Sequence, residues 1–148
     1  APAGEWLQVS IFLSPLDVHV NRVPATGTVT KVSVVPGRFL PAYRPDAATA
    51  NERTEIWIDH GGDLIVARQI VGMLARRIVC RLAPGAVVRA GDRYSVMKFG
   101  SRMDIFMPPS AEIRVAVGDR VRLLTQHGMA HTGDLQDGHR TLRATRVS

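Results

Sequence analysis

Cysteine, aromatic side chains and long apolar runs are all scarce in this sequence. One cysteine, Cys80, stands among 148 residues, which excludes an internal disulfide and fits a reducing compartment. Aromatic residues make up 5% of the chain, so a core has to be built mainly from Val, Ile, Leu, Met and Ala. No apolar stretch approaches the ~20 residues of a membrane-spanning helix, and no signal-peptide pattern is visible at the start. The length predicts one domain with a sizeable core.

The chain is basic, with 19 Lys and Arg against 13 Asp and Glu and a formal net charge of +6. This balance favours an anionic partner. No aromatic-rich basic patch or nucleic-acid-binding signature is present, so we expect a membrane surface or phospholipid headgroup and no nucleic acid. A basic surface that is merely solvated explains the charge equally well.

Short strands separated by Gly and Pro dominate the pattern. They predict a mainly β, single-domain fold, a β-sandwich or barrel-like arrangement of short antiparallel strands with Gly-centred turns. Alternation and β-branched residues place strands at 6–13, 27–35, 55–59, 64–71, 73–82, 93–99 and 103–107.

Three connecting segments carry further expectations. A hairpin is expected across Gly61-Gly62, because glycine adopts positive φ at little cost. The polar, proline-containing loop 41–51 is a candidate flap near a site. Near the end, His127, His131 and His139 lack the context of a metal site. We therefore expect no metal, and we expect residues 125–148 to form a loosely ordered tail.

The dipeptide Gly100-Ser101 lies between two strand-like segments. Read alone it indicates only a turn, because Gly-Ser is common there. A serine at such a point can also attack the preceding backbone carbonyl, turn the amide into an ester and eliminate to leave a pyruvoyl group. The segments that accompany the dipeptide decide between these interpretations.

Four segments, taken together, resemble the phosphatidylserine decarboxylase family, in particular its short bacterial type. They follow the family's order and cover most of positions 5 to 120. The segments are residues 11–22 (IFLSPLDVHVNR), 51–53 (NER), 69–80 (QIVGMLARRIVC) and 99–104 (FGSRMD).

The resemblance implies a pyruvoyl-dependent carboxy-lyase made as a self-cleaving proenzyme. Cleavage between Gly100 and Ser101 would give a β chain, residues 1–100, and an α chain, residues 101–148, which begins with a pyruvoyl group derived from Ser101. Its carbonyl would condense with the amine of phosphatidylserine as a Schiff base and take up electrons as carbon dioxide leaves, giving phosphatidylethanolamine. The catalytic residues implied are Ser101, His19 and Gly100.

His19 stands where the family's pattern has its histidine. An imidazole there can take the Ser101 proton during self-cleavage or return a proton to the substrate. From the residues alone, a structural histidine that binds a backbone carbonyl is the simpler interpretation, and the resemblance reverses that order. Asp17 would share one side of an extended strand with His19 and could orient it or cap a turn. Arg22 stands where the longer branch of the family has a second histidine, and residues 25–27 hold no carboxylate for that branch's relay.

Other polar residues in the matching segments allow two interpretations each. One of Arg76 and Arg77 could bind the substrate phosphate. Neighbours in a strand point to opposite faces, however, and solvent exposure or an ion pair with Glu52 or Glu55 fits as well. Residues 51–53 could line a site or close a loop.

We therefore expect one phosphatidylserine decarboxylase domain, residues 1–148, acting on phosphatidylserine at an anionic membrane surface. The expected location is peripheral, on the cytoplasmic side of a bacterial cell membrane, with α and β chains from one proenzyme and room for a homo-oligomer. The alternatives are a non-catalytic β-barrel module that binds anionic lipid or an anionic partner, and a decarboxylase of another serine-headgroup lipid. The family usually closes with a Gly-Glu-Thr-Val strand, whereas residues 123–128 read LLTQHG, so we expect an unpaired sheet edge.

Overall fold

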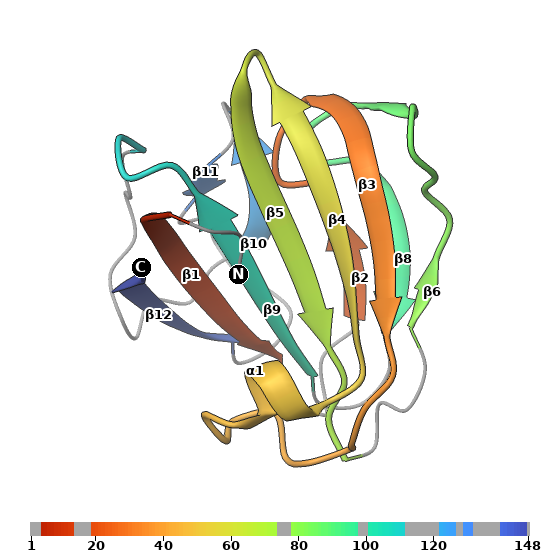
Figure 1. Ribbon diagram of the computed structural model, residues 1–148, viewed down its shortest axis with the longest axis vertical. Coiled ribbons are helices and arrows are strands. Elements are labelled where there is room, and N and C mark those ends of the chain that lie inside the picture. Colours follow the sequence, from red (N-terminus) through yellow and green to blue (C-terminus); the bar gives the residue numbers. More distant parts are fainter. Residues whose placement is uncertain are drawn as a thin grey trace.

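Antiparallel strands form nearly all the regular structure of the computed structural model, which describes residues 4–13, 19–73, 78–97, 101–111, 122–126, 129–131 and 140–147 (Figure 1). The mainly β prediction is confirmed. The strands are β1 (Trp6–Leu13), β2 (His19–Arg22), β3 (Gly27–Val35), β4 (Arg53–His60), β5 (Asp63–Ile70), β6 (Val79–Cys80), β7 (Val87–Val88), β8 (Arg93–Met97), β9 (Ser101–Met107), β10 (Arg122–Gln126), β11 (Met129–His131) and β12 (Arg140–Val147). A short helix, α1 (Ala47–Ala50), interrupts them. Within the described residues, no helix is long and apolar enough to cross a membrane.

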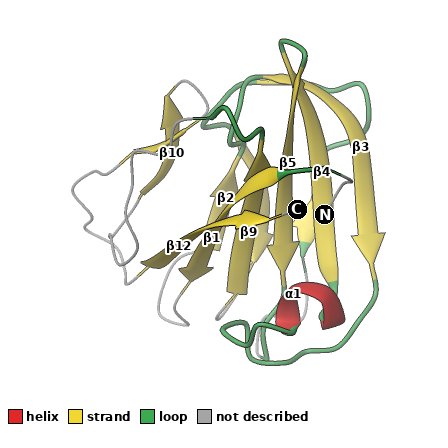
Figure 2. Ribbon diagram, turned by 60° about the vertical axis from the view of Figure 1, so that its left-hand side comes forward, coloured by secondary structure: helices red, strands yellow, loops and turns green. Residues whose placement is uncertain are grey.

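The strands form one large sheet and two small ones. The large sheet has the order β12-β1-β9-β5-β4-β3-β7, and β2-β8-β6 and β10-β11 form the others. The sheet β2-β8-β6 lies across one face of the large sheet (Figure 1). Figure 2 shows the strands of the large sheet side by side, with α1 beneath one end. The large sheet is open, with β12 and β7 as its outer strands, so the arrangement is a sandwich of layers.

The core fills the space between the large sheet and the sheet β2-β8-β6. Successive side chains of a strand point to opposite faces, and in β9 Met103, Ile105 and Met107 face this core. Tyr94 of β8 belongs to it as well. Burial, with a smaller contribution from Cys80, raises the pKa of the Tyr94 phenol far above its ordinary value, so the phenol stays neutral. The other buried members come from the large sheet and from the segment between β2 and β3: Val9, Ile11, Val23, Ala25, Val29, Ile56, Ile58, Ile65, Ala67 and Val88.

Several predicted strands are confirmed, two of them to the residue. The ranges 6–13 and 27–35 are β1 and β3. The expected hairpin is β4–β5, and its turn holds Gly61 at φ 60° and Gly62 at φ 96°, which a side chain would disfavour.

Two strand predictions are corrected by the structure. Among the described residues of 73–82, only Val79–Cys80 is a strand. One further backbone bond, from Arg81 N to Tyr94 O at 3.3 Å, continues the contact with β8, and no regular pairing follows it towards Pro84, which has no N–H to donate. Ser101 was placed in a turn, but it is the first residue of β9.

Part of the expected C-terminal tail is a strand. β12 pairs antiparallel with β1 along its whole length, from Trp6 opposite Val147 to Leu13 opposite Arg140. The C-terminal residues were expected to leave a sheet edge unpaired, and β12 instead pairs with the edge of β1. Residues 127–128 and 132–139 lie outside the described residues, and the division into domain and tail stays a prediction.

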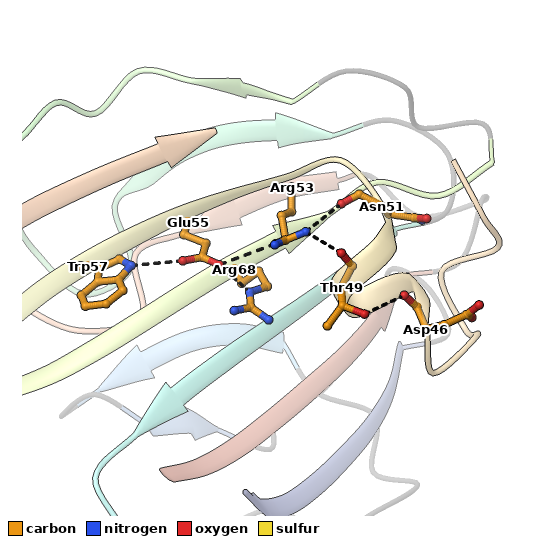
Figure 3. A network of polar contacts seen from close by, with 7 residues as sticks. All are labelled: Asp46, Thr49, Asn51, Arg53, Glu55, Trp57 and Arg68. Carbon is orange, nitrogen blue, oxygen red and sulfur yellow. Dashed lines mark hydrogen bonds and ion pairs between the residues drawn. The ribbon is translucent and has the colours of Figure 1, made fainter. Parts of the chain in front are cut away.

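A chain of charged contacts covers the other face of the large sheet (Figure 3). Glu55 of β4 accepts a hydrogen bond from Arg68 Nε of β5 at 2.8 Å and another from Trp57 Nε1 at 3.3 Å. Arg53 Nε lies 3.8 Å from the same carboxylate. Burial alone would raise the pKa of Glu55, but Arg68, the two hydrogen bonds and Arg53 outweigh it and hold that pKa below 4.5.

We expect Glu55→Gln to lower the free energy of unfolding at neutral pH by about 2 kcal/mol, because charge-assisted hydrogen bonds are lost and Arg68 stays buried without its charge partner. A lowered pKa in the folded state contributes stability above the unfolded pKa and loses it as pH falls through the folded pKa. The difference in the free energy of unfolding between Glu55→Gln and the unmutated chain should therefore become smaller as the pH is lowered from neutral into acid. Urea unfolding at a series of pH values measures this difference.

Asp46→Asn is the control, because the Asp46–Arg44 pair is about half exposed and such pairs contribute little. A Glu55→Gln deficit that stays constant from neutral pH to acid would contradict the electrostatic account.

Candidate active site

The pairing registers bring the ends of five strands of the large sheet to one level. Ser101, the first residue of β9, lies opposite Leu13, the last residue of β1. One position along, the row Val35, Arg53, Ile70 and Arg102 crosses β3, β4, β5 and β9. We call this level, with the loops that leave it, the Ser101 end; Figure 1 shows it with α1 alongside.

Ser101 is buried, with 1% of its surface exposed. It shares the face of β9 that carries Met103 and Ile105, because these positions are two and four residues away. Its side chain therefore lies on the core side of the sheet. Gly100, the other half of the proposed scissile bond, lies outside the described residues.

His19 is brought to the same end by strand pairing. It is the first residue of β2 and lies opposite Met97, the last residue of β8. Three residues separate Met97 from Ser101, so the two Cα atoms are at most about 14 Å apart. Position 19 belongs to the same face of β2 as Asn21, since the two positions are two apart along the strand. Asp17, Arg76 and Arg77 lie outside the described residues, so their predicted roles stay untested.

A buried polar cluster between the layers was missed by the sequence analysis. Gln69 of β5, fully enclosed, donates from Nε2 to Ser95 Oγ of β8, and Asn21 Nδ2 lies 3.4 Å from the same hydroxyl. Gln69 lies opposite Met103, two residues from Ser101 in β9. Among the described residues, Gln69 Oε1 has no hydrogen-bond partner. A buried amide oxygen without a partner is costly, which makes it a candidate contact for a bound group beside Ser101.

The sequence contains a weak indication that Gln69 has a special role. Residues 64–71 form an apolar run that is interrupted by Arg68 and Gln69. In a strand enclosed on both faces, a polar pair of this kind places one side chain on each side, and both must find partners. Arg68 forms an ion pair with Glu55 on the outer face of the large sheet, and Gln69 donates a hydrogen bond to Ser95 between the two layers.

Asn51 ties a loop to the Ser101 end. Its side chain is fully buried. Oδ1 accepts from Leu40 N at 2.9 Å, and Nδ2 donates at 2.8 Å to the carbonyls of Leu40 and of Val71, the residue after β5. Of the two interpretations open for residues 51–53, closing a loop is the one that these three bonds of Asn51 support.

The same loop is held by backbone contacts. Arg38 N donates to Ala50 O at 2.8 Å, and Glu52 N donates to Arg38 O at 3.0 Å. Gly37 makes this approach possible, because a Cβ there would lie 2.5 Å from Ala50 O. The predicted flap 41–51 therefore contains α1. Hydrogen bonds anchor its C-terminal end beside the Ser101 end.

Comparisons with known proteins give one consistent family. The sequence profile of that family, phosphatidylserine decarboxylase, matches residues 3–127. The chain is 48% identical over 114 residues to the phosphatidylserine decarboxylase proenzyme of Pelodictyon phaeoclathratiforme, covering 77% of this chain and 54% of the relative. For the proenzyme of Salinibacter ruber the identity is 47% over 120 residues, covering 80% and 53%. The chain thus spans about half the length of the curated relatives it matches. No solved structure matches it.

We expect Asn51→Leu to lower stability by about 3 kcal/mol, because a near-isosteric apolar side chain leaves buried backbone groups of Leu40 and Val71 without their partner. Amide hydrogen exchange should accelerate across residues 36–52 in particular. Thermal unfolding followed with exchange mass spectrometry measures both effects.

Thr49→Val provides the control, since the Thr49 hydroxyl bonds Asp46 O at an exposed site. Equal melting temperatures and equal loop exchange in the two variants would show that Asn51 does not hold the loop.

Proposed function

Because the chain belongs to the phosphatidylserine decarboxylase family, we propose that it is the self-cleaving, pyruvoyl-forming catalytic part of a phosphatidylserine decarboxylase. The observation that carries this proposal is the position of Ser101. It is a buried residue at the first position of a central strand, at the point where the chain passes from one sheet to the other.

The position of the cut favours survival of the fold. The strand before it, β8, is paired with β2 and β6 in the small sheet. The strand after it, β9, is paired with β1 and β5 in the large sheet. Cleavage between residues 100 and 101 therefore removes no strand pairing. Both fragments are expected to stay together after the cut.

Self-cleavage can be written with the chain's own atoms. Ser101 Oγ attacks the Gly100 carbonyl carbon, the C–N bond breaks, and the acyl group moves from nitrogen to oxygen. Loss of the Ser101 Cα proton and of the Gly100 carboxylate leaves a dehydroalanine at residue 101. Its imine form takes up water and releases ammonia, which leaves the pyruvoyl carbonyl. A residue that takes and returns protons is needed, and His19 is our candidate because strand pairing places it at the Ser101 end.

The surroundings of residue 101 suit the amine that a carbonyl there would bind. Gln69 Oε1 has no partner among the described residues, and as an acceptor it fits an N–H donor and not the carbonyl oxygen itself. A pyruvoyl group at residue 101 supplies a carbonyl that condenses with an amine and an electron sink for the departing carbon dioxide. The chain's part is to hold residue 101 rigidly at the end of β9 and to move protons there.

The substrate we propose is phosphatidylserine, and the product is phosphatidylethanolamine. The net charge of +6 supports work at an anionic membrane surface, because basic proteins are attracted to anionic lipid. We propose a peripheral location on the cytoplasmic side of a bacterial cell membrane.

Ser101→Ala should abolish both cleavage and carbon dioxide release, because alanine has no hydroxyl to attack Gly100. Intact-mass spectrometry of the purified chain should show two fragments, residues 1–100 and a 101–148 fragment with a blocked first residue. Release of carbon dioxide from phosphatidylserine is the second readout.

Ser33→Ala, in β3 of the same sheet, controls for loss of a serine and should be cut normally. An unmutated chain that stays intact and releases no carbon dioxide would overturn the proposal. Vesicle binding that persists in that intact chain would favour a non-catalytic lipid-binding module instead.

His19→Ala should slow cleavage by at least about a hundredfold, the usual range for loss of a general acid or base. The cut fraction is followed by gel electrophoresis after purification of the uncut protein. Added imidazole should restore part of the rate. His60→Ala, at the opposite end of β4, should cleave at the normal rate, and equal rates for the two variants would exclude His19 from the reaction.

A further inference from the structure

Large apolar side chains that stay exposed are unevenly distributed over the described residues. Val87, at 82% exposure, lies in β7 opposite the beginning of β3, far from the Ser101 end. The other six lie at or near the Ser101 end: Val34, Phe39, Tyr43, Met73, Val79 and Val96. Contiguous exposed apolar surface on a protein usually marks a binding face.

Three of these side chains extend past the ends of the strands. Phe39 and Tyr43, 38% and 75% exposed, belong to the loop between β3 and α1, and Met73, 55% exposed, follows β5. The Asn51 side chain bonds both Leu40 and Val71, which ties the stretch of chain that carries Phe39 to the stretch that carries Met73. We call Phe39, Tyr43 and Met73 the apolar rim.

The other exposed apolar residues border the same end. Val34 is the last residue but one of β3. Val79 and Val96 form a cross-strand pair in the small sheet, and Val96 precedes Met97, which lies opposite His19. Exposed apolar side chains are therefore present on both layers at the end that holds positions 19 and 101.

The rim is held in place and is not a fraying loop. Asn51 and the Arg38 backbone bonds fix its base, and Arg44 N donates to Pro41 O at 3.0 Å in the turn that carries Tyr43. A surface fixed before binding spends less free energy on ordering when a partner arrives.

Exposed arginines flank the two aromatic residues of the rim. Arg38 precedes Phe39 and is exposed. Arg44 follows Tyr43, and its ion pair with Asp46 is about half exposed and so weak. At the opposite end, the β4–β5 turn carries the exposed carboxylates of Asp59 and Asp63. Exposed arginines beside both aromatic side chains of the rim are placed to contact the phosphates of an anionic surface.

We infer that the apolar rim is the surface by which this chain docks on an anionic phospholipid bilayer. Aromatic and Met side chains enter the boundary between headgroups and acyl chains, while arginines stay at the phosphates. The inference rests on the proposed function, because a phospholipid whose acyl chains stay in the bilayer reaches residue 101 only if the Ser101 end faces the membrane.

The test compares Phe39→Ser/Tyr43→Ser with Val87→Ser, which makes the same kind of change at the far end. Sedimentation with vesicles of phosphatidylcholine and phosphatidylserine measures docking. Carbon dioxide release is measured on these vesicles and on a short-chain phosphatidylserine kept below its micelle concentration. Intact mass reports self-cleavage.

For Phe39→Ser/Tyr43→Ser we expect vesicle binding to fall about tenfold or more, because two aromatic side chains that would enter the bilayer are lost. The ratio of vesicle turnover to short-chain turnover should fall by a similar factor, while self-cleavage proceeds. Val87→Ser should match the unmutated chain in all three measurements.

Equal sedimentation of Phe39→Ser/Tyr43→Ser and the unmutated chain would overturn the docking surface. So would size-exclusion data in which the double change converts a dimer to a monomer, because the rim would then bind a second copy. Failure of the proposed function is seen separately, as an unmutated chain that neither cuts itself nor releases carbon dioxide from the short-chain lipid.

Discussion

The pairing of β9 between β1 and β5 is the interaction on which the rest of the Ser101 end depends. One face of β9 is packed into the core through Met103 and Ile105. The other face is fixed by charge, with Arg102 Nε donating to Asp104 Oδ1 at 2.7 Å and Arg102 Nη2 to Ser10 Oγ at 3.2 Å. A strand held on both edges and both faces gives its first residue little freedom, and a reacting group needs that restraint.

The loop after β3 reaches the same level by a different kind of restraint. The side-chain amide of the buried Asn51 makes hydrogen bonds to backbone groups that are not paired with another strand. Its three hydrogen bonds join two stretches of chain that have no regular structure at that point. The loop can therefore present apolar side chains outward while its own backbone polar groups remain satisfied.

The local pattern of apolar and polar residues was enough to predict strands that are buried on one face and more polar on the other. In β1 and β3 the alternation and the β-branched residues agree with the final pairing, and the hairpin turn is fixed by its two glycines. The apolar residues of 73–82 are typical of a longer strand. Among the described residues of that segment only Val79 and Cys80 are in register with β8, and a local pattern does not reveal that register. β12 has no such pattern at all, and its partner is the edge of β1.

The residues of the candidate site also fall into those that the sequence indicates and those that depend on contacts between distant segments. Ser101 and His19 were singled out by the segments that resemble the family, and their placement at one end needed the registers of two separate sheets. For Asn51 the sequence leaves two roles open, lining a site or closing a loop, because its contact with Val71 spans 20 residues of sequence. Gln69 was overlooked because its partner Ser95 is supplied by the opposite layer.

The strand order β12-β1-β9-β5 has a consequence for how such a chain can be made. Divided at residue 100, these strands alternate between the two pieces, so each piece supplies strands that lie between strands of the other. Neither piece alone could satisfy the edges it would expose, and long unpaired edges aggregate. Folding as one continuous chain would then be a precondition for the cut, and the uncut precursor would serve as the template on which the two-chain form is assembled.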